Sequence, residues 1–130
     1  MRLIYLANPY HSTEEIMEER HRRLMEVLAS CANTTENLVF YSPIAHWHET
    51  AKHHKLPTSF SWWRERDFFM LRKCSALWVL PIEGWEDSYG VSQEIEFATD
   101  TNIPIFYIID YVPSVVVTQE KPRHPLPLVF

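Results

Sequence analysis

The stretch from Ala76 to Ala98 constrains the fold most. It opens with the apolar residues 76–80, whose β-branched and aromatic content predicts a buried strand, and a helical pattern follows after a short loop. Ser88 is a good N-cap for that helix, and Gly90 in its first turn lets a ligand approach unpaired backbone N–H groups. This order predicts a strand–loop–helix unit whose helix end attracts anions.

Two acidic residues occupy helix faces that are otherwise apolar. Glu94 is aligned with Val91 and Ala98, and Asp67 lies on the apolar side of a second helix expected over residues 61–74. An isolated buried carboxylate is very costly, so such a residue is paired, neutralised or placed in a cleft. A structural ion pair is one outcome. Because ligands of parallel α/β sheets bind beyond the carboxyl ends of the strands, the other is that both acids converge on one pocket.

The rest of the chain alternates between apolar runs and amphipathic patterns. This alternation predicts an α/β domain over residues 1–110, with a parallel sheet of four or five strands, followed by an arm over residues 111–130. The apolar segment 126–130 is expected to dock on the domain or on a neighbouring subunit. Ser12 and Glu15 form a capping-box signature for a helix over residues 13–32. Further strands are expected at residues 3–7, 38–41, 105–109 and 115–118, and the helix after Ser88 is expected to end near Asp100.

Charge and apolar patterning narrow the possible partners. The net charge of −5 and the lack of a long Lys/Arg tract argue against nucleic-acid polymers. No apolar segment reaches the length of a membrane helix, and the first residues lead into a strand rather than a signal peptide, so we expect a cytoplasmic protein with no membrane partner. Cys31 and Cys74 fall in helical patterns and are expected to be reduced. The loop Asn8-Pro9-Tyr10-His11 has no glycine, which excludes a Walker or a dinucleotide fingerprint there.

A histidine-rich stretch follows the second expected strand. His46 and His48 are two residues apart, a spacing that chelates on an extended segment, and His53 and His54 follow in a part too irregular to assign. No second acid–histidine motif or nearby cysteine completes a ligand set, so we expect no metal. The stretch is interpreted instead as a wall or lid that contacts a heterocycle through Trp47 and the histidines.

Three motifs together resemble the nucleoside 2-deoxyribosyltransferase superfamily, which includes the 2'-deoxynucleoside 5'-monophosphate N-glycosidases. The resemblance spans residues 3–109. The sequence Gly84-Trp85-x-Asp87-Ser88 is most similar to a branch of short uncharacterised proteins within it. The motifs are Tyr5-Leu6-Ala7, Glu65-Arg66-Asp67 and Ser88-x-Gly90-x-x-x-Glu94 with Ala98.

The resemblance implies a fold, a reaction and residue roles. The fold is a Rossmann-like or flavodoxin-like three-layer sandwich, and the reaction needs no cofactor. Glu94 is implied as the nucleophile that attacks the anomeric carbon of a 2-deoxyribose, Asp67 as the residue that contacts the base and helps its departure, and Tyr5 as the residue that positions Glu94. Ser88 is implied to hold a 5'-phosphate or to meet a 5'-hydroxyl. The other substrate-binding residues that we expect are Gly90, Asn8, Pro9, Tyr10, His46, Trp47, His48 and Trp63.

This chemistry agrees with the two acids found on apolar faces. Retaining cleavage of a glycosidic bond uses two carboxyl groups about 5 Å apart, one as nucleophile and one as acid. If water resolves the glycosyl-enzyme the protein is a hydrolase, and if a second base does so it is a transferase. The sequence leaves both open.

Other features leave the substrate and the class of function open. The loop after the first strand lacks the glycine and arginine of nucleotide-preferring relatives, and Glu83, Glu86 and Asp87 oppose a phosphate near Ser88, so a nucleotide is favoured only slightly over a nucleoside. A binding module without turnover and a histidine-metal hydrolase are the alternatives. The resemblance and the aromatic content favour a homodimer or higher homo-oligomer.

Overall fold

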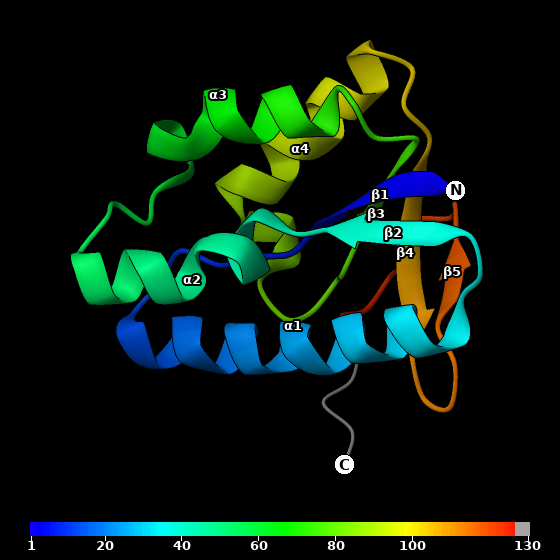
Figure 1. Ribbon diagram of the computed structural model, residues 1–130, viewed down its shortest axis with the longest axis horizontal. Coiled ribbons are helices and arrows are strands. Elements are labelled where there is room, and N and C mark those ends of the chain that lie inside the picture. The colour runs from blue at the N-terminus through cyan, green and yellow to red at the C-terminus, as the bar shows by residue number, and fades with distance from the viewer. Residues whose placement is uncertain (127–130) are drawn as a thin grey trace.

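The computed structural model describes residues 1–126 and has one five-stranded sheet at its centre, in the order β2-β1-β3-β4-β5 (Figure 1). Neighbouring strands pair in parallel except β5, which is antiparallel to β4. This strand order is that of the flavodoxin-like doubly wound fold. The predicted α/β sandwich is confirmed. The strands are β1 (Arg2–Ala7), β2 (Leu38–Tyr41), β3 (Ala76–Val79), β4 (Ile105–Asp110) and β5 (Val116–Thr118).

Helices cover both faces of the sheet. Figure 1 shows α1 along one side and α3 with α4 on the other, while α2 lies beside α1. Side chains of β1 alternate between the two faces: Leu6 packs in the cluster that includes α1, and Tyr5 packs in the cluster that includes α3 and α4. β3 is buried along its whole length, as expected for a central parallel strand. The helices are α1 (Glu14–Thr34), α2 (Pro43–His54), α3 (Phe60–Leu71) and α4 (Tyr89–Asp100), with the short 3₁₀ helix η1 (Trp85–Asp87) before α4.

The histidine-rich stretch is a helix, so its interpretation as an extended and irregular segment is wrong. Ser42 caps α2, since its side-chain oxygen accepts from the backbone N–H of Ala45 at 3.1 Å. Pro43 stands in the first turn, where proline's fixed φ suits a helix. Lys55, in the left-handed conformation with φ 53°, ends it.

The start and end of the first helix also differ from the prediction. Thr13 rather than Ser12 is the N-cap, because the Thr13 hydroxyl accepts from the backbone N–H of Ile16 at 3.3 Å. The helix continues to Thr34, two residues beyond the expected end. The capping-box interpretation was therefore one residue out of register.

The segment after β4 returns to the domain. β5 adds an antiparallel edge strand, and the buried Leu126 donates its backbone N–H to the carbonyl of Pro81 at 2.8 Å. Leu126 belongs to the core cluster beside α1. The other four residues of the segment expected to dock, 127–130, lie outside the described residues.

Two further sequence expectations can be compared with the described residues. None of the helices there combines the length and the apolar character that crossing a membrane requires. Cys31 and Cys74 are both buried and not joined in a disulfide. Burial raises the pKa of both thiols, to about 12 and about 11 respectively, so both stay protonated near neutral pH.

Candidate active site

A cavity of about 540 Å³ lies where β1, β2 and β3 end and the following helices begin. This is the edge at which open parallel sheets bind ligands. The cavity collects most of the site residues expected from the sequence. Those that line it are Asn8, Tyr10, Trp47, His48, Trp63, Asp67, Ser88, Gly90 and Glu94.

Glu94 is held at the floor of this cavity by a tyrosine. It is 4 % exposed on α4, whose first turn is fixed by the Ser88 side chain accepting from the Val91 N–H at 3.2 Å. The hydroxyl of Tyr5, fully buried in β1, donates to Glu94 Oε2 in a short hydrogen bond. Burial, followed by the charges of Glu94 and Asp67, raises the pKa of Tyr5 far above its ordinary value, so this hydroxyl remains a donor. Tyr5 therefore lies beneath the cavity and orients Glu94.

Asp67 and Glu94 form an electrostatically coupled pair. Burial raises the pKa of Asp67 from 3.8 to about 7, against the opposing charge of Arg66. Burial also raises the pKa of Glu94, and the charge of Asp67 adds to it, whereas the hydrogen bond from Tyr5 lowers it. The two carboxyls therefore titrate as a coupled pair. The Tyr5 hydroxyl favours the negative charge on Glu94 and so opposes the effect of burial on its pKa.

Aromatic side chains form one wall of the cavity. The rings of Trp47 on α2 and Trp63 on α3 lie 5.3 Å apart between centroids. Trp63 is fixed further by its indole N–H, which donates to the carbonyl of Pro57 at 2.7 Å. Such a wall favours stacking of a planar heterocycle.

The corner near Ser88 contains the helix cap that the sequence predicted. The Ser88 side chain serves as the helix cap, and a Cβ added at Gly90 would lie 3.1 Å from the ring of Phe60, a tight contact that would require the ring to shift. The guanidinium of Arg20 on α1, which sequence analysis did not select, lines the cavity and donates to the carbonyls of Tyr10 at 3.2 Å and Glu83 at 3.5 Å.

The sequence matches a family model described as "Domain of unknown function (DUF1937)" over residues 2–109. The chain belongs to the DUF1937 family. A search of curated proteins finds no match. The matched region runs from β1 into β4, so every cavity residue named above lies within the DUF1937 domain.

Three expected site residues of the DUF1937 domain do not line the cavity. Tyr5 acts from beneath through Glu94, as described above. Pro9 is fully buried behind the cavity, although its carbonyl accepts from the amide of Asn8 at 2.9 Å. His46 faces solvent from α2 and is not among the lining residues, so the structure does not bring it together with the other expected site residues.

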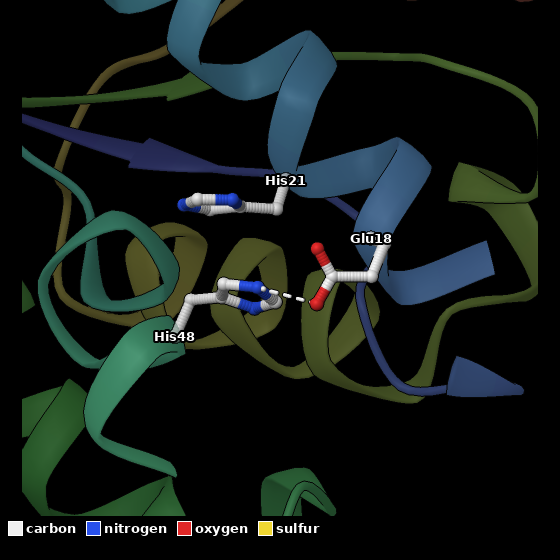
Figure 2. A group of neighbouring side chains, drawn as sticks. All are labelled: Glu18, His21 and His48. Atoms are coloured by element: carbon white, nitrogen blue, oxygen red, sulfur yellow. Dashed lines mark hydrogen bonds and ion pairs between the residues drawn. The ribbon is translucent and has the colours of Figure 1, made fainter. Parts of the chain in front are cut away.

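A different histidine group exists beside the cavity of the DUF1937 domain (Figure 2). Glu18 and His21 on α1 and His48 on α2 offer ligand atoms within 4.8 Å of one another, and it is the one group of this kind among residues 1–126. The two imidazole rings are stacked at 3.8 Å and 16°, so their in-plane lone pairs run side by side and do not converge on an ion. Lys52 places its ammonium 2.9 Å from Glu18 Oε1. This geometry favours a hydrogen-bonded cluster over a metal centre.

Proposed function

We propose that this DUF1937 protein cleaves or exchanges the N-glycosidic bond of a 2'-deoxynucleoside or its 5'-monophosphate. The observation that carries the proposal is the buried, tyrosine-bound Glu94 coupled to Asp67 in one cavity. The resemblance to deoxyribosyltransferases names the same residues independently of the structure. Structural ion pairs of acids with arginine or lysine do not explain these acids, because burial dominates the pKa of both.

In the first step Glu94 attacks the anomeric carbon and forms an ester with the sugar. The bond between sugar and base breaks, and its electron pair leaves on the base nitrogen. Asp67, whose pKa of about 7 keeps a large protonated fraction near neutral pH, donates a proton to the departing base. A 2-deoxy sugar lacks the electron-withdrawing hydroxyl beside the reacting carbon, which makes this step more accessible.

The walls of the cavity suit the two halves of such a substrate. Trp47 and Trp63 offer ring faces to a base. Asn8 is 3 % exposed, and its Oδ1 has no hydrogen-bond partner among the described residues, so it is free to accept from a sugar hydroxyl. The volume of about 540 Å³ falls in the range of small-molecule sites.

Arg20 supports a 5'-monophosphate over an unphosphorylated nucleoside. A phosphate bound near Ser88 needs a cation that offsets the charges of Glu83, Glu86 and Asp87. In the structure Arg64 and Arg66 lie exposed on α3 against aromatic rings, whereas Arg20 lines the cavity. A guanidinium binds phosphate oxygens strongly.

The test is base release from a panel of 2'-deoxynucleosides and their 5'-monophosphates, followed by chromatography with and without an acceptor base. Glu94→Gln should abolish release, and the matched control Glu96→Gln, an exposed acid on the same helix, should retain it. Undiminished release by Glu94→Gln would remove the assignment of the nucleophile. Thermal stabilisation by a ligand with no product from the wild type would favour the binding module instead.

A further inference from the structure

A chain of hydrogen bonds connects the cavity to the helix surface through a histidine. The hydroxyl of Tyr10, which lines the cavity, lies 2.7 Å from Nδ1 of His48. The opposite ring nitrogen, Nε2, lies 3.1 Å from Glu18 Oε1, and Figure 2 shows this second contact. His48 is 3 % exposed, so both of its nitrogens are used inside the protein.

The ionisation of Glu18 determines which atom donates in each hydrogen bond of this chain. Its hydrogen bond to Lys52 lowers the pKa of Glu18, so the carboxylate is ionised and only accepts. His48 Nε2 therefore donates to Glu18, and in the neutral ring Nδ1 is left as an acceptor. Tyr10 must donate its own hydroxyl proton to Nδ1. The lone pairs of the Tyr10 oxygen then remain available to accept from a group in the cavity.

A second histidine and three charged side chains surround His48. The stacked His21 covers one face, and burial followed by the neighbouring His48 lowers the pKa of His21. The charged groups that face this cluster are Glu18 from α1 and Glu49 and Lys52 from α2. Burial and the charges of Glu18 and Glu49 raise the pKa of Tyr10 to about 12. Tyr10 therefore gives up its proton only as it receives another.

We propose that Tyr10, His48 and Glu18 form a proton relay that activates the water which releases the sugar from Glu94. This inference rests on the proposed function and decides between hydrolase and transferase in favour of the hydrolase. The arrangement is that of a hydroxyl, a histidine and an orienting carboxylate, in which the histidine accepts the proton of the hydroxyl. Here the hydroxyl is the intermediary and water is the nucleophile.

In the proposed step a water molecule displaces the sugar from Glu94. The water oxygen bonds to the anomeric carbon, and the ester bond from that carbon to Glu94 breaks with its electron pair returning to the Glu94 carboxylate. The water proton passes to the Tyr10 oxygen while the Tyr10 proton passes to His48 Nδ1. His48 becomes an imidazolium paired with Glu18, and it later returns the proton to solvent along the same path. Asp67, which gave its proton to the base in the first step, takes up one proton from solvent, and this restores the resting site.

The test separates the two halves of the reaction. Tyr10→Phe and Glu18→Gln are assayed with a 2'-deoxynucleoside 5'-monophosphate that the wild type cleaves, by rapid-quench measurement of free base and by intact mass of the protein. The relay predicts an initial burst approaching one base per Tyr10→Phe molecule, then turnover slowed about 100-fold or more. A 5-phospho-2-deoxyribosyl adduct should accumulate on the protein, and Glu18→Gln should show the same with a smaller slowing.

The controls isolate the relay from folding and from the first step. His53→Gln, an exposed histidine of the same helix, should behave as the wild type. His48→Gln is assayed in the same way, and a thermal melt establishes whether it is folded. A folded His48→Gln protein that accumulates no adduct contradicts the relay. A Tyr10→Phe that loses the burst itself, or that keeps wild-type turnover, overturns the proposal. If the wild type releases no base from any substrate, the proposed function fails and the relay with it, whereas wild-type cleavage without adduct in the variants removes the relay alone.

Discussion

Substituting Asp67 by asparagine tests the buried charge of the site without requiring any substrate. In the folded protein burial raises the pKa of Asp67 from 3.8 to about 7. Between these two values the folded state holds a proton that the unfolded state releases. The stability that Asp67 contributes is therefore fully present below about pH 4 and is lost as the pH rises to about 7.

The size of the effect follows from the same shift. At about 1.4 kcal/mol per pH unit, the rise corresponds to about 4 kcal/mol of unfavourable free energy when Asp67 is ionised. Asp67 opens on a cavity that water reaches, which reduces the cost, so we expect about 2 to 3 kcal/mol. The asparagine side chain of the variant carries no charge at any pH. Asp67→Asn should therefore raise the free energy of unfolding more at pH 8 than at pH 4.5, by that difference.

Urea unfolding followed by far-ultraviolet circular dichroism at the two pH values measures this difference. Glu65→Gln, an exposed acid on the same helix, is the matched control and should change stability by less than about 0.5 kcal/mol at either pH. An Asp67→Asn protein whose stability relative to wild type is the same at pH 4.5 and pH 8 would refute the interpretation that Asp67 is a buried carboxyl whose charge is not compensated. So would a variant less stable than the wild type at pH 8.

Two other predictions concern Glu94 and the assembly. Tyr5→Phe removes a hydrogen bond to a buried carboxylate, worth about 1.5 to 3 kcal/mol, so Glu94 should ionise at higher pH. The acid limb of the pH–rate profile for base release should move upward by about 1 to 2 pH units, and an unmoved limb would contradict the role of Tyr5. Large apolar side chains on α3 and at the start of α4 are exposed, including Phe69 at 54 % and Tyr89 at 57 %, and we expect a homodimer by light scattering that Phe69→Glu dissociates. A wild-type monomer at the assay concentration would count against self-association.

The central elements were predictable because their signals are local. The apolar run at residues 76–80 produced β3, apart from its last residue, and the three-and-four spacing placed Glu94 on the buried face of α4. The same spacing placed Asp67 on the inner side of α3, and both acids do line one cavity. The contact of Tyr5 with Glu94 joins residues 89 apart in the chain, so sequence patterns could not predict it. Only the family resemblance implied it.

The features that the sequence did not predict depend on how the helices pack against each other. α2 was missed because Pro43 followed by histidines and a lysine has no clear apolar stripe, so its helical character comes from the Ser42 cap and from packing on α1. The contacts of His48 with Tyr10 and Glu18 span 38 and 30 residues. Arg20 has the pattern of a surface residue on a long helix, and its contacts with the carbonyls of Tyr10 and Glu83, both outside that helix, hold it at the cavity.

The pairing of Trp47 with Trp63 makes intrinsic tryptophan fluorescence a way to detect a ligand in the cavity. Their indole rings lie 5.3 Å apart at the cavity wall, one on α2 and the other on α3. A heterocycle that stacks there alters the emission of both indoles. Intrinsic fluorescence of a Glu94→Gln protein can thus be used to titrate ligands into the cavity, since the proposed reaction should not proceed in that variant.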